Sequence, residues 1–239
     1  RDVLGSRGLG DVYKRQIISY FLGFGRQMAM GIQVQAATVI LGSQNLVAVL
    51  GIVTAVGSMI SMALCTLLIK KLNERNAYIL LSVYGFAASI FSFVIGHFWF
   101  QSPKNMVLTV LFYASLFLIG LQFGAVTLMP MIMTADAVDY YEYETGKRME
   151  GACYSILTLT IKVCLALGTA VGLIFVQKSG YYESLTAGTF TTKTKDIIFF
   201  AYTALPGILA LISIFPMFKY DIVGEKKAKI SSELAARRK

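Results

Sequence analysis

Long apolar stretches alternate with short polar connections along most of this chain. A helix that crosses a bilayer needs about 20 apolar residues. The pattern predicts six spanning helices, at residues 17–41, 46–69, 77–98, 106–133, 153–176 and 197–218. The fourth span is long enough to project beyond the bilayer, and Pro130 in its final turns is a candidate kink. The predicted fold is therefore all-α, a polytopic membrane protein with six transmembrane helices.

Composition and charge placement agree with this prediction. The chain has 239 residues, of which 56% are hydrophobic and 15% charged, whereas a soluble domain is roughly 25% charged. A net charge of +9 could indicate a nucleic-acid partner, but the basic residues lie mainly in short connections and in the tail. They favour the connections at residues 70–75 and 147–148 and the tail at 219–239, so both ends are expected to be cytoplasmic.

Two cations lie deep inside predicted spans. Lys162 follows the start of the fifth span by nine residues, a depth of ~13 Å in a hydrocarbon core of ~30 Å, and Arg26 is about as deep in the first. A charge at that depth costs several kcal/mol unless it is paired or hydrated. The six spans contain no equally deep Asp or Glu. The two cations are thus stabilised by a water-filled cavity, by an anionic substrate or by carboxylates of other helices. The alternative interpretation is that both side chains are anchors that snorkel to the membrane surface.

Polar and small side chains form further patterns within the spans. The first span also carries Gln27 and Gln33, which either line a cavity or make interhelical hydrogen bonds. Small residues recur at helical spacing in the second span (Thr54, Ser58, Ser61, Cys65), the third (Ser82, Gly85, Ser89, Ser92, Gly96) and the fourth (Gly120, Gly124). Helix packing is the favoured interpretation of the first two stripes, and the glycines of the fourth span allow close packing or room for a ligand.

The connection between the fourth and fifth spans, residues 134–151, is dense in charge. Three acidic residues, Asp136, Asp139 and Glu142, follow one another at intervals of three, and the positively charged Lys147 and Arg148 come after them. Exposed ion pairs are worth only ~0–1 kcal/mol each, so several of them can form and break in every cycle of a moving protein. The segment is therefore either a gating latch or a solvated loop.

The same segment, Asp136-Ala-Val-Asp139-Tyr140-x-Glu142-Tyr143-x-Thr145-Gly146-x-Arg148-x-Glu150-Gly151 followed by Lys162, resembles a known signature. It is similar to the signature between the tenth and eleventh helices of the glycoside–pentoside–hexuronide:cation symporters of the major facilitator superfamily. The resemblance implies that the six spans are helices 7–12 of a twelve-helix carrier, its C-terminal half.

The resemblance also implies a function, which is sugar:cation symport by alternating access. The sugar would contact Arg26, Gln27 or Gln33, Thr127, Thr158 and Lys162, and the deep cations make an acidic sugar such as a glucuronide a candidate. The gating group would comprise Asp136, Asp139, Tyr140, Glu142, Lys147 and Arg148. No cofactor or metal is implied beyond a coupling Na⁺ or H⁺, bound mainly by the missing N-terminal half.

Three segments follow from these observations. Residues 1–16 resemble a translated sequencing adapter and are expected to be a non-native leader, residues 17–220 form the transmembrane bundle, and residues 221–239 form a basic cytoplasmic tail that is solvated or a short amphipathic helix. The expected partners are the lipid bilayer, a small sugar or glycoside and the missing half, with no nucleic acid. The expected location is the bacterial inner membrane.

Alternative functions remain open on the sequence. A lysolipid or other amphiphile carrier of the same superfamily would need an apolar cleft that opens to lipid. An intramembrane enzyme would have to use the pair Asp136 and Asp139, because the chain contains no HExxH, Walker A or GxSxG motif. A fragment without activity of its own is the third alternative, since half a carrier is not expected to transport.

Overall fold

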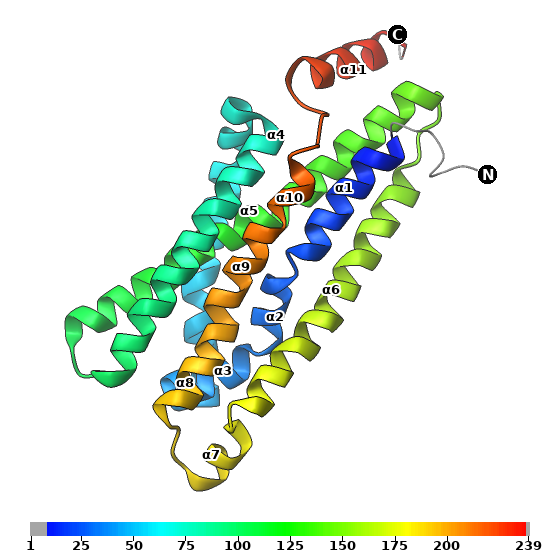
Figure 1. Cartoon of the computed structure of the whole chain (residues 1–239). Helices are drawn as coiled ribbons and strands as arrows, with labels where there is room; N and C mark the ends of the chain where they lie inside the picture. Colours follow the sequence, from blue (N-terminus) through cyan, green and yellow to red (C-terminus); the bar gives the residue numbers. More distant parts are fainter. Residues whose placement is uncertain (1–8, 238–239) are drawn as a thin grey trace.

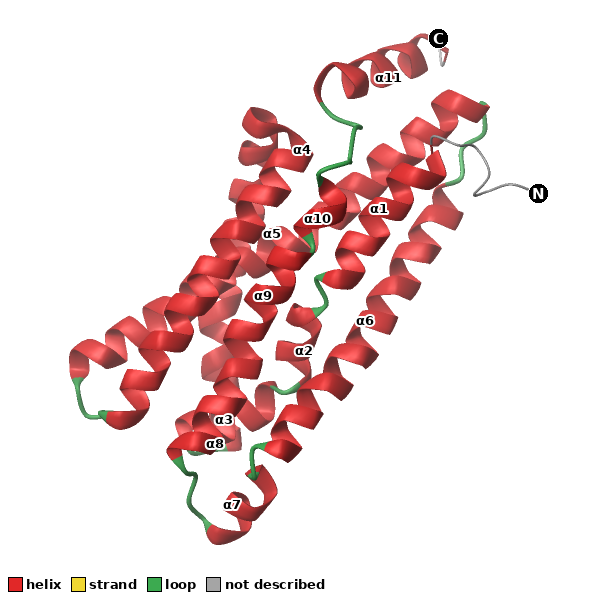
Figure 2. Cartoon of the chain, in the orientation of Figure 1, coloured by secondary structure: helices red, strands yellow, loops and turns green. Residues whose placement is uncertain are grey.

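The computed structural model describes residues 9–237, and over that range it consists of helices joined by short connections, without a strand (Figures 1 and 2). The predicted all-α fold is confirmed. Residues 1–8 of the expected leader and residues 238–239 of the tail lie outside the described residues.

Four stretches of the described chain are long and apolar enough to cross a membrane. The first three contain α4 (Val47–Gln101), α5 (Met106–Thr145) and α6 (Glu150–Lys178). The fourth is a succession of shorter elements: α8 (Thr192–Phe199), η2 (Phe200–Ala204, a π-helix), α9 (Leu205–Ile212) and α10 (Ile214–Met217). The connection between α6 and α8 holds α7 (Tyr181–Ala187), and the 3₁₀ turn η1 (Gln44–Leu46) precedes α4.

Helix α4 contains both the second and the third predicted spans. Its helical backbone is interrupted at Asn73, where φ is 64° and ψ is 162°, and the chain changes direction there (Figure 1). The interruption falls inside the basic connection predicted at residues 70–76. Helix α4 thus consists of two arms, one on each side of Asn73. The count of six spans stays a prediction.

The first predicted span, residues 17–41, is not one helix, so this part of the prediction is wrong. The structure divides it into α1 (Leu9–Leu22), α2 (Gly25–Gly31) and α3 (Gln33–Leu41). Glycines at both ends of α2 permit backbone contacts that a longer side chain would block. A Cβ at Gly25 would lie 2.4 Å from Cα of Pro206, and one at Gly31 would lie 2.8 Å from Cα of Thr169. These two glycines therefore allow α2 to lie directly against α9 and α6.

Helix α1 begins at Leu9 and so runs through the boundary expected at residue 17. The hydroxyl of Tyr13 donates to the backbone oxygen of Cys153, and Nε2 of Gln16 donates to the backbone oxygen of Pro130 at 2.8 Å. Pro130 itself lies within the continuous helix α5. The start of the helix and the expected end of the leader therefore do not coincide, and the origin of residues 1–16 stays a prediction.

The first arm of α4 and helix α5 are in close backbone contact. A Cβ at Gly120 would lie 2.4 Å from the backbone oxygen of Thr54, and one at Gly124 would lie 2.1 Å from that of Ser58. The hydroxyl of Ser58 donates to the backbone oxygen of Gly120 at 3.1 Å. Of the two interpretations of these glycines, the structure supports close packing.

Two apolar clusters lie at different ends of the bundle. One is aromatic and centres on Trp99 and Phe112, whose stacked rings are 4.5 Å apart, with Phe199 packed against them. The other combines aromatic and aliphatic residues of α5 and of α11 (Gly224–Arg237), among them Tyr140, Tyr141, Ile230 and Leu234. The end formed by the Asn73 turn, the last turns of α5 and α11 is called the charged end below.

Candidate functional site

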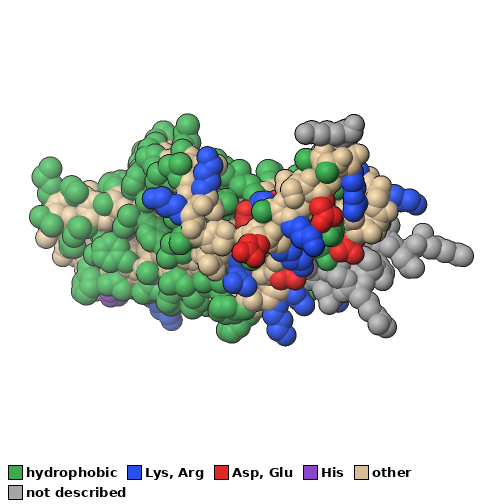
Figure 3. Space-filling model, turned by 90° about the horizontal axis from the view of Figure 1, so that it is seen from above, with side chains coloured by type: hydrophobic (Ala, Val, Ile, Leu, Met, Phe, Trp, Pro, Cys, Tyr) green, Lys and Arg blue, Asp and Glu red, His purple; other side chains and the backbone are tan. Residues whose placement is uncertain are grey.

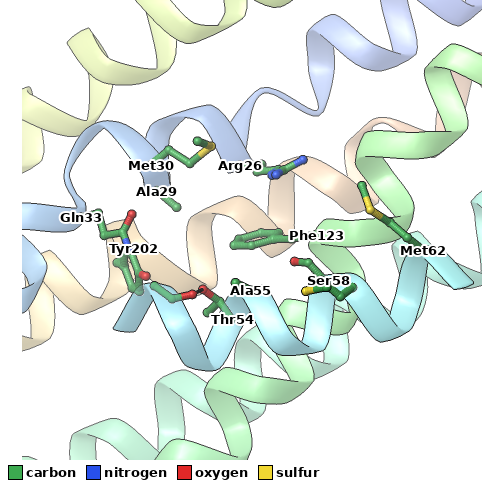
Figure 4. A pocket seen from close by; sticks show the side chains of 12 residues that line it. Arg26, Ala29, Met30, Gln33, Thr54, Ala55, Ser58, Met62, Phe123 and Tyr202 are labelled. Carbon is green, nitrogen blue, oxygen red and sulfur yellow. Dashed lines mark hydrogen bonds between the residues drawn. The ribbon is translucent and has the colours of Figure 1, made fainter. Parts of the chain in front are cut away.

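A cavity of about 290 Å³ opens between α2, α3, η2, the first arm of α4 and α5 (Figure 4). Its polar lining residues come from separate segments of the chain: Arg26, Gln33, Thr54, Ser58 and Tyr202. The remaining lining is apolar and includes Ala29, Met30 and Phe123. A concave, largely apolar site with a few converging polar groups is the usual form of a small-molecule site.

Arg26 is the cation of this cavity. Its guanidinium carbon lies 5.7 Å from the centre of the Phe123 ring, a cation–π contact, and Figure 4 shows the two side chains next to each other. Its Nε is buried and makes no hydrogen bond to any described residue. A buried donor without a partner is costly, so this edge of the guanidinium favours a ligand that supplies an acceptor.

Gln33 lines the same cavity one helix further on, at the end nearer Tyr202 (Figure 4). Arg26 and Gln33 are seven residues apart, a spacing that places two residues on one face of a helix, and both line this cavity. Thr54 and Ser58 lie across from them on α4, and their hydroxyls donate to backbone oxygens of Leu50 and Gly120.

The other predicted contact residues are not among those that line the cavity. Nε2 of Gln27, a buried side chain, donates to the Tyr20 hydroxyl at 2.6 Å, and the hydroxyl of Thr127 donates to the backbone oxygen of Phe123. Thr158 and Lys162 are exposed on α6. They are four residues apart and so share one face of this helix, which differs from the face that carries its buried residues. Their role as a sugar site stays a prediction.

Three polar lining residues, Thr54, Ser58 and Tyr202, were not assigned a site role from the sequence. Thr54 and Ser58 belong to the small-residue stripe of the second span, which was interpreted as packing. Both interpretations apply to them, because their backbone oxygens face the glycines of α5 and their side chains border the cavity. Tyr202 lies in the π-helix η2, inside the sixth predicted span. The sequence signal that could have pointed to Tyr202 is a tyrosine shortly before Pro206 in an apolar span. A π-helix in such a place often occurs at a functional site.

The charged segment between the fourth and fifth predicted spans is mostly helical, which corrects its description as a loop. Helix α5 continues through Asp136, Asp139, Tyr140 and Glu142 and ends at Gly146, whose φ is 69°. Glycine adopts this left-handed conformation without the steric cost that other residues incur, so the helix ends there. Only residues 146–149 connect α5 to α6.

Arg148, in this short connection, gathers three carboxylates. Its NH1 lies 3.2 Å from Oδ1 of Asp139 and 2.7 Å from Oε2 of Glu142, and its Nε lies 2.8 Å from Oε1 of Glu150. Hydrogen bonds to Glu150 and Glu142 raise the pKa of the Arg148 guanidinium. Arg148 and Asp139 are both exposed, so each pair contributes ~0–1 kcal/mol.

Asp136 has a different partner, which lies on the last helix of the chain. Nζ of Lys227 is 2.8 Å from its carboxylate and 2.5 Å from Oε1 of Glu74, which follows the Asn73 turn. Burial lowers the pKa of Lys227, but its hydrogen bonds to Asp136 and Glu74 outweigh this effect and raise the pKa above its ordinary value. Lys227 is therefore a stable ammonium bound to two carboxylates.

The remaining predicted gating residues lie in the same area. Nζ of Lys226 is 5.0 Å from the centre of the Tyr140 ring, and the backbone N–H of Lys147 donates to the Thr145 hydroxyl at 3.3 Å. Figure 3, a view of this end, shows Lys, Arg, Asp and Glu side chains gathered in one area beside an extensive hydrophobic surface. Among the described residues, no group of three or more His, Cys, Asp or Glu side chains is placed to hold a metal ion.

Long apolar helices, a largely apolar cavity with a few converging polar groups and a cluster of ion pairs at one end define an integral membrane protein of the transporter class. The chain belongs to the MFS/sugar transport protein family, whose sequence model matches residues 22–224. This membership confirms the resemblance to the glycoside–pentoside–hexuronide:cation symporters, and it places the chain among transporters and not among enzymes.

Curated relatives carry names that agree with the family. The chain is 24% identical over 212 residues to a putative sulfoquinovose importer of Escherichia coli. These residues are 88% of the chain and 42% of that protein. It is 24% identical over 187 residues to a glucuronide carrier protein homolog of the same organism, covering 77% and 38%. It is 26% identical over 223 residues to a lactose permease of Lactobacillus delbrueckii, covering 90% and 33%. The chain thus spans less than half the length of each of these relatives.

Proposed function

We propose that this chain is the C-terminal half of a sugar:cation symporter that works by alternating access. In such a carrier, two six-helix bundles rock about a central site and open it to one side of the membrane at a time. Family membership supports sugar transport, and the names of the relatives support symport and permease activity. The observation that carries the proposal is the cavity that Arg26, whose Nε has no partner among the described residues, lines together with Gln33, Thr54 and Ser58.

The chemistry of this cavity suits a sugar. Hydroxyl groups of a sugar both donate and accept hydrogen bonds, and amide, hydroxyl and guanidinium side chains complement them. Phe123 offers an apolar ring surface between Arg26 and Gln33 (Figure 4). Thr127, Thr158 and Lys162 join the site in the complete carrier, as the family resemblance implies.

The rest of the transport cycle involves groups outside the cavity. Exposure of Lys162 on α6 supports a position that faces the second half of the carrier, whose carboxylates bind the coupling Na⁺ or H⁺. The charged end faces the cytoplasm of a bacterial cell, where Asp139, Glu142 and Arg148 exchange partners as that side of the carrier opens and closes. No organic cofactor takes part in this mechanism.

A direct test replaces Arg26 in the full-length carrier that contains this chain. Arg26→Ala should lower the apparent sugar affinity by about ten- to a hundredfold, because a charged hydrogen bond to a ligand is worth about 1.5–3 kcal/mol. The measurement is uptake of labelled sugars into vesicles under an imposed Na⁺ or H⁺ gradient. Unchanged affinity in Arg26→Ala for every sugar transported would remove the cavity from the site, and absence of gradient-driven sugar uptake in the wild type would refute symport.

An amphiphile carrier is the second candidate, because a further cavity is strongly apolar. It measures about 330 Å³ and is lined between the two arms of α4 and α5 by Ser61, Leu64, Cys65, Leu68, Leu80, Leu81, Tyr84 and Leu121. A lysolipid could place its acyl chain there. Uptake of a labelled lysolipid that is not competed by sugars would favour this function over sugar transport.

A further inference from the structure

The last helix of the chain is packed against the bundle, so of the two predictions for the tail the structure supports a short amphipathic helix and not a solvated segment. Ile230 is 5% exposed and Leu234 is 4% exposed, and both belong to the apolar cluster that includes Tyr140 and Tyr141 of α5. Their spacing of four residues places them on one side of α11, and Lys227, three residues before Ile230, lies on the same side. Figure 1 shows α11 lying across the end of the bundle, near the end of α5.

Lys227, whose side chain is 36% exposed, connects this helix to two other elements through carboxylates that water scarcely reaches. The side chains of Glu74 and Asp136 are only 6% and 9% exposed, and the ammonium of Lys227 contacts both carboxylates. Without the ammonium, two carboxylates would remain close together in a poorly solvated place, which is strongly unfavourable. Lys227 thus joins the Asn73 turn of α4, the end of α5 and α11.

Neighbouring charged groups do not take over this role. Arg75 directs NH1 to the backbone oxygen of Tyr220, and Lys226 pairs with Asp221 at 2.7 Å. Arg148 is engaged by Asp139, Glu142 and Glu150. Among the described residues, Lys227 is therefore the cation that contacts Asp136.

Asp136 and Asp139 consequently differ, although both belong to the same acidic series of the sequence signature. Asp139 is 44% exposed and pairs with Arg148 nine residues away, whereas buried Asp136 pairs with a residue that is 91 positions distant. An exposed pair can change partners at little cost, whereas a buried carboxylate that loses its cation is left uncompensated, at a much higher cost. The acidic series thus contains an exchangeable member and a fixed one.

We propose that Lys227 is a positioning residue for transport: it fixes Asp136 and Glu74 and thereby clips α11 across the charged end. Asp139, Glu142 and Arg148 are then left as the groups that exchange partners. The clip itself is a property of this chain, and its effect on transport rests on the proposed function. Removing the ammonium releases α11 and allows Asp136 to compete with Asp139 for cations nearby.

The clip is tested first without transport, by hydrogen–deuterium exchange of the whole chain in lipid nanodiscs. An isolated helix of this length is marginal in water, so a released α11 exchanges its amide hydrogens rapidly. Lys227→Ala should accelerate exchange over residues 224–237 by about tenfold or more. The matched control is Lys229→Ala, which removes the same charge from the same helix, because Lys229 is 70% exposed and lies 3.9 Å from its partner Glu233.

A second variant keeps the test informative if loss of Lys227 disturbs the fold widely. Adding Glu74→Gln to Lys227→Ala removes one of the two uncompensated carboxylates, so exchange over residues 224–237 should slow toward the wild-type rate. Equal exchange in Lys227→Ala and Lys229→Ala would overturn the clip, as would the absence of any slowing by Glu74→Gln.

The effect on transport is measured in the full-length carrier at matched expression. Lys227→Ala should change the maximal rate of sugar uptake severalfold and leave the KM within about twofold, and Lys227→Arg should restore most of the rate. A proportional change in KM would overturn the positioning role. A wild-type carrier that moves no sugar would refute the proposed function, while the exchange experiment would still decide whether Lys227 clips α11.

Discussion

The central cavity and the charged end handle positive charge in opposite ways. In the cavity, Arg26 has an aromatic ring beside it and a buried Nε that makes no hydrogen bond to the described residues. At the charged end, Lys227 contacts two carboxylates and Arg148 contacts three. Unsatisfied polarity suits a site that a ligand completes, whereas saturated ion pairs suit a structure that holds a conformation and exchanges it at low cost. This difference predicts that substitutions in the two regions alter different kinetic parameters.

The largest effect should come from Lys162, which belongs to neither group of contacts in this structure. If Lys162 faces carboxylates of the second half, it stabilises their ionised form and competes with the coupling cation. Lys162→Ala should then abolish cation-driven uptake, and Lys162→Arg should also fail, because a planar fork does not replace a compact ammonium. The measurement is uptake against an ion gradient at matched expression. Equal uptake and ion dependence in all three proteins would make Lys162 a membrane anchor.

A smaller effect is expected at the exchangeable part of the charged end. Arg148→Ala removes the partner of three carboxylates, and the conformational equilibrium of the carrier should shift while the sugar contacts stay intact. Turnover should fall by about tenfold with the sugar dissociation constant nearly unchanged, because several weak pairs sum to about 1–2 kcal/mol. Parallel measurements of equilibrium sugar binding and uptake decide this point. Equal losses in both would place Arg148 in the sugar site.

The smallest effect separates two glutamines of α3. Gln33 lines the cavity and Gln35 does not, although they have the same side chain and lie two residues apart. Gln33→Ala should raise the KM for sugar by about three- to tenfold, as expected for loss of one neutral hydrogen bond, and Gln35→Ala should leave the KM unchanged. A larger rise in KM for Gln35→Ala would contradict the cavity as the site.

Periodicity made the apolar spans predictable, because a bilayer demands a fixed length of hydrophobic helix. It did not reveal the breaks at residues 23–24 and 32, since they depend on contacts with Pro206 and Thr169 that lie far away in the sequence. The shared face of Arg26 and Gln33 follows from their spacing, but the contribution of Tyr202 to the same cavity requires the tertiary fold.

The charged end shows the same limit. The acidic series of α5 is evident in the sequence, and so is the basic character of the tail. Their pairing is not, because Lys227 is one of several lysines in the tail, and its place on the side of Ile230 and Leu234 does not reveal which carboxylates it meets. Only the burial of Ile230 and Leu234 fixes the rotation of α11 and thereby selects Lys227.

The glycines of α5 have a mechanical consequence. Because Gly120 and Gly124 let α5 touch the backbone of the first arm of α4 directly, no side chains separate the two helices at these points. The pair should behave as a stiff strut during large movements. Bending is then left to the segment that the chain itself interrupts, α1 to α3, and this segment carries Arg26 and Gln33. Bending and substrate contact would accordingly occur in the same interrupted segment, next to the closely packed pair of α4 and α5.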